Sequence, residues 1–260
     1  MVRDLLIRGM LAGAIAGLLA FGVAKVFGEP QVDRAIAFEE QHEHAAADQQ
    51  ATEAAHEHSQ GDQEEELVSR AVQSTTGLLT AVVVYGAAMG GLFALTFAFL
   101  YGRVGDISPR VLALLLALAA FAAIYYVPNL KYPANPPAVG DGATIGYRTG
   151  LFLLMILISL GGLVSAVALG RRLAEKHGGL NATLIGAGLF AAIIVIAQLV
   201  LPDVNEVPAD FPAVVLWKFR MASFGLQALM WATLGLLFGW LAERRLKPAP
   251  GQPARSLRPA

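Results

Sequence analysis

The chain has 260 residues, of which 56% are hydrophobic and only 15% are charged. A soluble domain of this size has too little interior to bury so much apolar surface, so lipid must solvate part of it. The net charge of −1 and the lack of a strongly basic domain exclude nucleic-acid binding, and the absence of cysteine excludes disulfides, iron–sulfur clusters and thiol catalysis.

Six apolar runs of about 20 residues follow one another along the chain, each long enough to cross a bilayer as a helix. They predict an all-α polytopic membrane protein with spans at 5–27, 76–101, 111–128, 149–170, 180–201 and 221–241. The first run lacks a convincing signal-cleavage site, so we expect a retained helix. Its Gly9, Gly13 and Gly17 are four residues apart, a spacing that lets another helix approach closely, although ordinary packing of small residues is the interpretation we favour.

The distribution of lysine and arginine over the polar gaps predicts the orientation. Alternate gaps and the two termini hold twelve of the nineteen basic residues but only four of the twenty acids. The remaining sixteen acids and four of the five histidines lie on the other side. We therefore expect both termini to be cytoplasmic. The predicted organisation is a first transmembrane helix at 1–27, an acidic histidine-bearing external loop at 28–75, five further helices within 76–246 and a disordered cytoplasmic tail at 247–260.

The external loop contains two His-Glu-His triplets, which supply the candidate metal ligands His42, Glu43, His44, His56, Glu57 and His58. They lie in a segment of high helix propensity, and fourteen residues make nearly four helical turns, so the triplets would share a helix face. Imidazole suits cobalt, nickel, copper and zinc better than magnesium or calcium. The alternative is a solvated polar spacer. One regular helix cannot close a tight site from a single triplet, so we expect a capture zone of modest affinity.

Two further outer loops resemble each other: residues 127–138 read VPNLKYPANPPA and residues 201–213 read LPDVNEVPADFPA. Each precedes an arginine and an apolar span, which favours three helical hairpins of the same orientation. Candidates for a pore mouth in these loops are Asn129, Asn135, Asp141, Asp203 and Asp210. Helix capping and turn formation are the alternative roles for such side chains. Arg70, Arg148 and Arg220 lie at helix entrances, and we expect them to pair with acids or to anchor at headgroups.

The predicted spans contain no Asp or Glu in mid-membrane, so a proton relay through buried carboxylates has no support. There is also no Walker sequence and no nucleophile–base pair. We therefore expect neither an enzyme nor a bound cofactor.

Residues 28–40, 130–141, 211–212 and 216–220 resemble the predicted cobalt transporter subunit family called CbtA, over nearly the whole chain. The KYPANPP block that begins at Lys131 is the most specific part. The resemblance implies a multi-pass protein of the prokaryotic cytoplasmic membrane that imports cobalt for cobalamin synthesis. It also implies a small one-span partner with its own histidine motif, CbtB, and it assigns no ligands. Nickel is an alternative cargo, and an accessory or scaffold protein that moves nothing is the alternative function.

Overall fold

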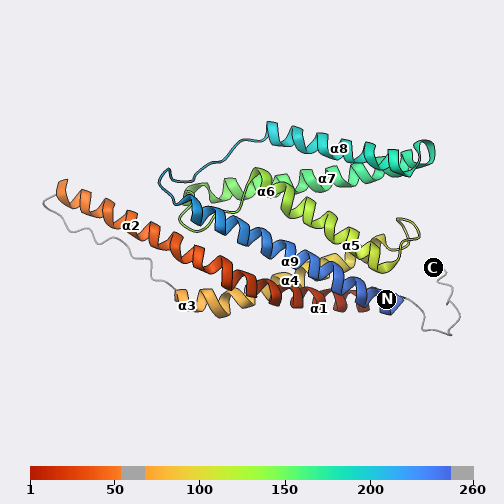
Figure 1. Cartoon of the computed structure of the whole chain (residues 1–260), viewed down its shortest axis with the longest axis horizontal. Coiled ribbons are helices and arrows are strands. Elements are labelled where there is room, and N and C mark those ends of the chain that lie inside the picture. The colour runs from red at the N-terminus through yellow and green to blue at the C-terminus, as the bar shows by residue number, and fades with distance from the viewer. Residues whose placement is uncertain (54–67, 247–260) are drawn as a thin grey trace. The chain divides into compact units, whose positions relative to one another are not determined.

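The structure is a computed structural model, and it describes residues 1–53 and 68–246 (Figure 1). This part of the chain is helical and contains no strand. Six helical stretches in it are long and apolar enough to cross a membrane: Val2–His42, Arg70–Leu100, Pro109–Lys131, Gly142–His177, Gly179–Val200 and Ala213–Leu246. The all-α fold with six candidate spans is therefore confirmed. The pairing into three hairpins and the side on which the termini lie stay predictions.

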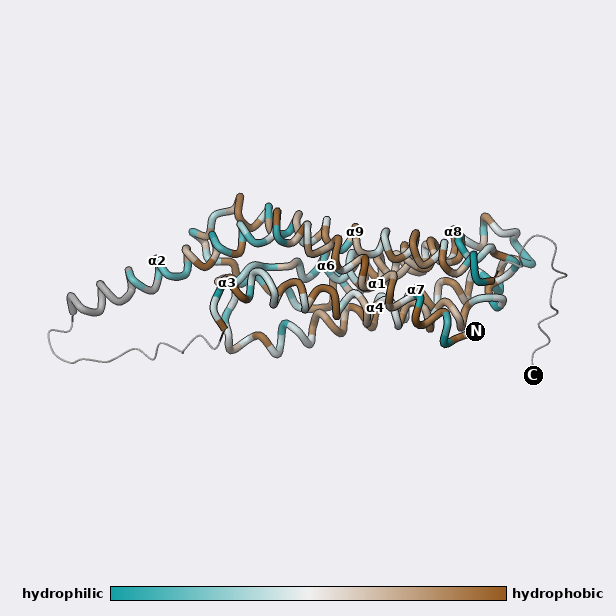
Figure 2. The backbone as a smooth tube through the Cα atoms, turned by 90° about the horizontal axis from the view of Figure 1, so that it is seen from below, coloured by the Kyte–Doolittle hydropathy of each residue, from teal (hydrophilic) through white to brown (hydrophobic). Residues whose placement is uncertain are grey.

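The first stretch runs from α1 (Val2–Val23) through a π-helical segment, η1 (Ala24–Gly28), into α2 (Glu29–Glu53). Figure 2 shows the change from apolar to polar residues along it. Alanine, glutamine and glutamate are strong helix formers, so the polar part stays helical after the apolar run ends. The first half of the predicted external loop is therefore helix. The second His-Glu-His triplet and the predicted tail lie outside the described residues.

The other elements follow in chain order. They are α3 (Arg70–Val72), η2 (Gln73–Gly77), α4 (Leu78–Leu100), α5 (Pro109–Ala120), η3 (Phe121–Tyr126), α6 (Val127–Lys131), η4 (Gly142–Thr144), α7 (Ile145–His177), α8 (Gly179–Val200) and α9 (Ala213–Leu246). Segments η2 and η3 are π-helical, and η4 is a 3₁₀ turn. Pro128 has no amide hydrogen to donate to the preceding turn, which agrees with the wider turns of η3 just before it.

The chain divides into two compact units, which are described separately. Unit 1 comprises Met1–Phe21, Leu79–Ala120 and the chain from Ala228 on, and unit 2 comprises Gly22–Leu78 and Phe121–Gln227. In unit 1, α1 and α4 pack closely and antiparallel. A Cβ atom on Gly9 would lie 2.4 Å from the Gly90 oxygen, and one on Gly13 would lie 2.0 Å from the Gly86 oxygen. The glycine spacing in the first span therefore does mark a helix contact, with α4 as the partner.

The rest of unit 1 packs around aromatic rings. Phe238 of α9 meets Phe93 and Phe97 of α4 edge to face, with ring centroids 5.4 and 5.1 Å apart. Ion pairs join helix ends in the same unit. Arg245 donates to Asp4 at 2.9 Å, and Arg110 lies 3.3 Å from Glu243. The start of α1, the start of α5 and the end of α9 are therefore held together.

In unit 2, α7 and α8 pack against each other antiparallel, and the two helices lie side by side in Figure 1. The turn between them contains Gly178, whose φ of +76° is a conformation that glycine adopts without strain. Small residues allow the close packing, because a Cβ on Gly186 would lie 2.7 Å from the Ala166 oxygen. Nearer the outer loops, Met155 of α7 and Ile194 of α8 are buried in one cluster with Val127.

Candidate functional site

The two similar outer loops of unit 2 lie against each other. Lys131 pairs with Asp203 and donates to the Gln198 carbonyl oxygen at 2.8 Å. The Tyr132 hydroxyl donates to the Pro202 carbonyl oxygen at 2.9 Å. Only 7% of the Lys131 side chain is exposed, so its ammonium needs these oxygens to offset the cost of burial. Asp203, a predicted pore-mouth residue, is therefore held by a lysine.

A second link between the loops centres on Glu206. One of its carboxylate oxygens accepts from the Asp141 amide at 2.9 Å and from the Thr144 hydroxyl at 3.0 Å, and it lies 3.3 Å from Arg148 Nε. Arg148 also donates to the Asp141 carbonyl oxygen at 3.0 Å. The Asp141 side chain accepts from the Ala143 amide at 2.8 Å and so caps η4. Asp141, predicted at the pore mouth, thus caps the start of a 3₁₀ turn in this arrangement.

Arg220 of α9 contacts the first loop through hydrogen bonds to uncharged oxygen atoms. Its Nη2 donates to Asn135 Oδ1 at 2.8 Å, and its Nε donates to the Ala134 carbonyl oxygen at 3.3 Å. Asn129 in turn accepts from the Ala134 amide at 3.1 Å. Two predicted pore-mouth residues, Asn129 and Asn135, and one predicted structural arginine therefore belong to one hydrogen-bonded cluster.

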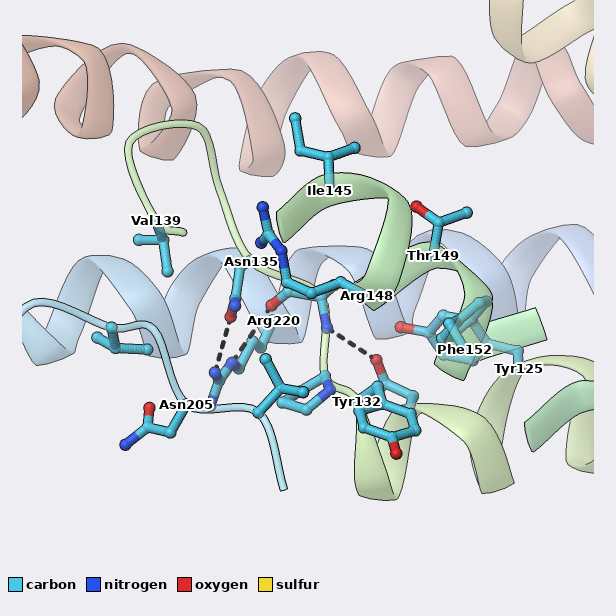
Figure 3. A pocket seen from close by; sticks show the side chains of 15 residues that line it. Tyr125, Tyr132, Asn135, Val139, Ile145, Arg148, Thr149, Phe152, Asn205 and Arg220 are labelled. Atoms are coloured by element: carbon cyan, nitrogen blue, oxygen red, sulfur yellow. Dashed lines mark hydrogen bonds between the residues drawn. The ribbon is translucent and has the colours of Figure 1, made fainter. Parts of the chain in front are cut away.

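Several of these residues line an open cavity of about 410 Å³, shown in Figure 3. Its lining includes Tyr125, Asn129, Tyr132, Asn135, Arg148, Thr149, Asn205 and Arg220. All of the lining residues belong to unit 2. The polar groups that face it are guanidinium, amide and hydroxyl groups, a set that differs from the oxygen-rich and imidazole-rich lining of a cation site.

A histidine from the first triplet meets an acid from the last outer loop. His42 Nε2 lies 2.5 Å from Asp210 Oδ2, and His42 Nδ1 lies 2.9 Å from the Phe38 carbonyl oxygen. Both neighbours are acceptors, so only the doubly protonated ring satisfies both contacts. The contact rests on a small apolar cluster that includes Ala35, Phe38 and Phe211. The hydrogen bond from His42 lowers the pKa of the Asp210 carboxyl below its ordinary value.

Arg70 fastens α3 to α2. Its Nη2 donates to Glu29 at 2.5 Å and to Asp33 at 2.9 Å. Near this pair, Lys25 of η1 donates to the Ser74 carbonyl oxygen of η2 at 3.0 Å. The two ends of the predicted external loop are therefore tied together by charge.

The structure thus brings His42 and Asp210 together, and it places Asn129 and Asn135 with Arg220. His44 is exposed on α2, whereas His56, Glu57, His58 and the Glu43 side chain lie outside the description. Within residues 1–53 and 68–246, no group of three or more His, Asp or Glu side chains is placed to hold a metal ion. Sequence reasoning expected Arg148 to pair with an acid or to anchor at a headgroup but did not single out Glu206, and it did not pair Lys131 with Asp203. The signal for these pairs was a basic residue in or just after the first loop and an acidic residue in the similar second loop.

Six candidate spans and an ion-paired set of loops define a multi-pass helical membrane protein. The family model described as probable cobalt transporter subunit (CbtA) matches residues 2–243. The chain therefore belongs to the CbtA family of probable cobalt transporter subunits, as the sequence motifs predicted. A subunit implies partner subunits. No curated protein and no solved structure matches the chain.

Proposed function

We propose that the chain imports cobalt across the prokaryotic cytoplasmic membrane to supply cobalamin synthesis, with side chains of the outer loops capturing the ion. Nickel is the alternative cargo, because generic nitrogen and oxygen sites bind it more tightly than cobalt. The family match over residues 2–243 supports the transport role. A small one-span, histidine-bearing subunit of the CbtB kind is the proposed partner.

The proposed sidedness places both termini in the cytoplasm and three hairpins in the same orientation. Its support is the excess of lysine and arginine near the termini and in the 102–110 and 171–179 gaps. The Arg245–Asp4 pair, which joins the start of α1 to the end of α9 in unit 1, agrees with termini on one side.

The observation that carries the capture step is the contact between His42 and Asp210. An imidazole nitrogen and a carboxylate oxygen are both ligands for cobalt, and here they approach from segments 168 residues apart in sequence. A divalent ion that replaces the shared proton would bind both. Water and other side chains of the two triplets would complete its coordination, which fits a capture zone better than a closed site.

Cobalt uptake by cells that express the chain and its partner tests this proposal. Replacing His42, His44, His56 and His58 by Gln should lower uptake at limiting cobalt by at least about tenfold, because metal affinity depends strongly on each ligand. Uptake should recover at high cobalt. His177→Gln is the matched control, since this exposed histidine lies at the end of α7 in a predicted cytoplasmic gap. Binding should also weaken below about pH 6, where imidazole is protonated.

Equal uptake by the fourfold variant and the control would remove the histidines from the capture step. The accessory role is then favoured. One observation already supports it: the described carboxylates of the outer loops are mostly engaged by basic groups, and none of them joins a group of three metal ligands. Cobalt flux into liposomes that contain the chain with and without the one-span partner separates the two functions. Flux in neither preparation would favour the scaffold.

A further inference from the structure

The cavity between the outer loops of unit 2 has a positive lining. Two guanidinium groups, those of Arg148 and Arg220, face it, and no Asp or Glu is among the described residues that line it. Figure 3 shows both arginines and Asn205 around the space. A bare divalent cation in this cavity would be repelled by the guanidinium charge, with no lining carboxylate to hold it, so the cavity does not suit the cargo as a free ion.

The two arginines differ in how their charge is balanced. Arg148 has Glu206 within ion-pair distance at 3.3 Å. Arg220 donates only to neutral oxygens, those of Asn135 and Ala134, and no carboxylate in the described chain lies within ion-pair distance of it. A partly buried charge without a counterion is costly, and a guanidinium offers a planar set of donors that matches carboxylate and phosphate oxygens.

Neutral donors complete the surroundings. Asn129 and Asn205 contribute amide groups to the lining, and Thr149 contributes a hydroxyl. Such groups orient an anion and satisfy oxygens that the guanidinium does not reach. A volume of about 410 Å³ is large enough for a small organic acid or a phosphate headgroup.

We propose that this cavity binds an oxyanion, a carboxylate or phosphate group, through the Arg220 guanidinium. This inference goes beyond the proposed capture of cobalt and does not depend on it. The same chemistry is offered by a soluble acid and by the headgroup of an anionic lipid, and the experiment separates these sources.

The test measures the binding of citrate and of inorganic phosphate to the full-length chain, purified in detergent, by titration calorimetry at pH 7.5. Arg220→Gln should weaken binding by at least about tenfold, because it removes a charge-assisted contact. Asn135→Asp should also weaken anion binding by at least about tenfold. The new carboxylate keeps the contact with Arg220 but neutralises its charge from within the protein. The matched control is Arg172→Gln, which removes the same charge from an exposed position on α7 away from the cavity. It should leave binding unchanged.

The lipid source is tested on the same variants. If a headgroup fills the cavity, phosphorus analysis should find phospholipid retained by the parent chain and by Arg172→Gln, but lost from Arg220→Gln and from Asn135→Asp. In nanodiscs, anionic lipid should then raise the thermal midpoint of the parent chain over that in zwitterionic lipid, and not that of Asn135→Asp. Arg220-dependent binding of citrate or phosphate supports a soluble anion, and Arg220-dependent lipid retention supports a headgroup. Binding of neither, or binding that Asn135→Asp leaves intact, overturns the proposal.

Discussion

At the residue scale, the contact between His42 and Asp210 depends on pH in two directions. The hydrogen bond from His42 lowers the pKa of the Asp210 carboxyl, and a backbone hydrogen bond acts in the same sense. A lowered pKa means that folding favours the carboxylate. Its contribution to stability is therefore present above the ordinary carboxyl pKa and is lost as the pH falls through the folded value. At high pH the contact weakens again, because neutral imidazole has only one N–H to donate.

Asp210→Asn should accordingly lower the thermal midpoint of the purified chain at pH 5.5 and leave it nearly unchanged at pH 8. The expected fall is less than about 3 °C, because both side chains are exposed and solvent screens the pair. Midpoints measured by tryptophan fluorescence from pH 5 to 8.5 check this. An equal fall at every pH would mean that Asp210 acts by packing and not by its charge.

At the element scale, α1 and α4 approach until backbone touches backbone. The carbonyl oxygen of Gly86 occupies the place of a Gly13 side chain, and the Gly9 oxygen similarly occupies that of Gly90, where a Cβ would lie 2.1 Å away. Helices in lipid gain little from burying apolar surface against each other, so close van der Waals contact contributes much of their association. The glycines therefore set how near the two helices can come.

Gly13→Ala should separate α1 from α4 and lower the free energy of unfolding by about 1–3 kcal/mol, the usual cost of overpacking. The measurement is unfolding in mixed micelles by increasing denaturing detergent. Gly22→Ala on the same helix is the control, since a Cβ there meets nothing within 4 Å. A similar loss in both variants would point to a general effect of glycine replacement in α1.

At the scale of the whole molecule, charge is divided between alternate gaps of the chain. In unit 1, the Asp4–Arg245 and Arg110–Glu243 pairs join segments predicted to be cytoplasmic. In unit 2, the pairs of Lys131, Arg148 and His42 join segments predicted to be external. Each unit therefore links gaps that were predicted to lie on the same side.

The chain contains no cysteine, so a single introduced cysteine is the only thiol that a labelling reagent can modify. The side of the membrane on which a residue lies can therefore be measured directly. Ala209→Cys, exposed in the last outer loop, should react with an impermeant maleimide in intact cells. Glu175→Cys, exposed near the end of α7, should react only after lysis. The reverse pattern would invert the topology and remove the import model, whereas the helical fold would stand.

The sequence alone determined the six spans and the family, because hydropathy over 20 residues and short sequence motifs are local signals. The spacing of Gly9, Gly13 and Gly17 only allowed a close helix approach, and the structure showed that α4 makes it. Only the tertiary structure decided which charges meet. His42 lies 168 residues from Asp210, and Lys131 lies 72 residues from Asp203, and nothing in one sequence chooses such partners among sixteen acids on the same predicted side. It also showed Arg220 beside a cavity without a carboxylate partner among the described residues. Long-range pairing depends on how the loops fold over the helix ends, and a pattern of residue types does not contain that geometry.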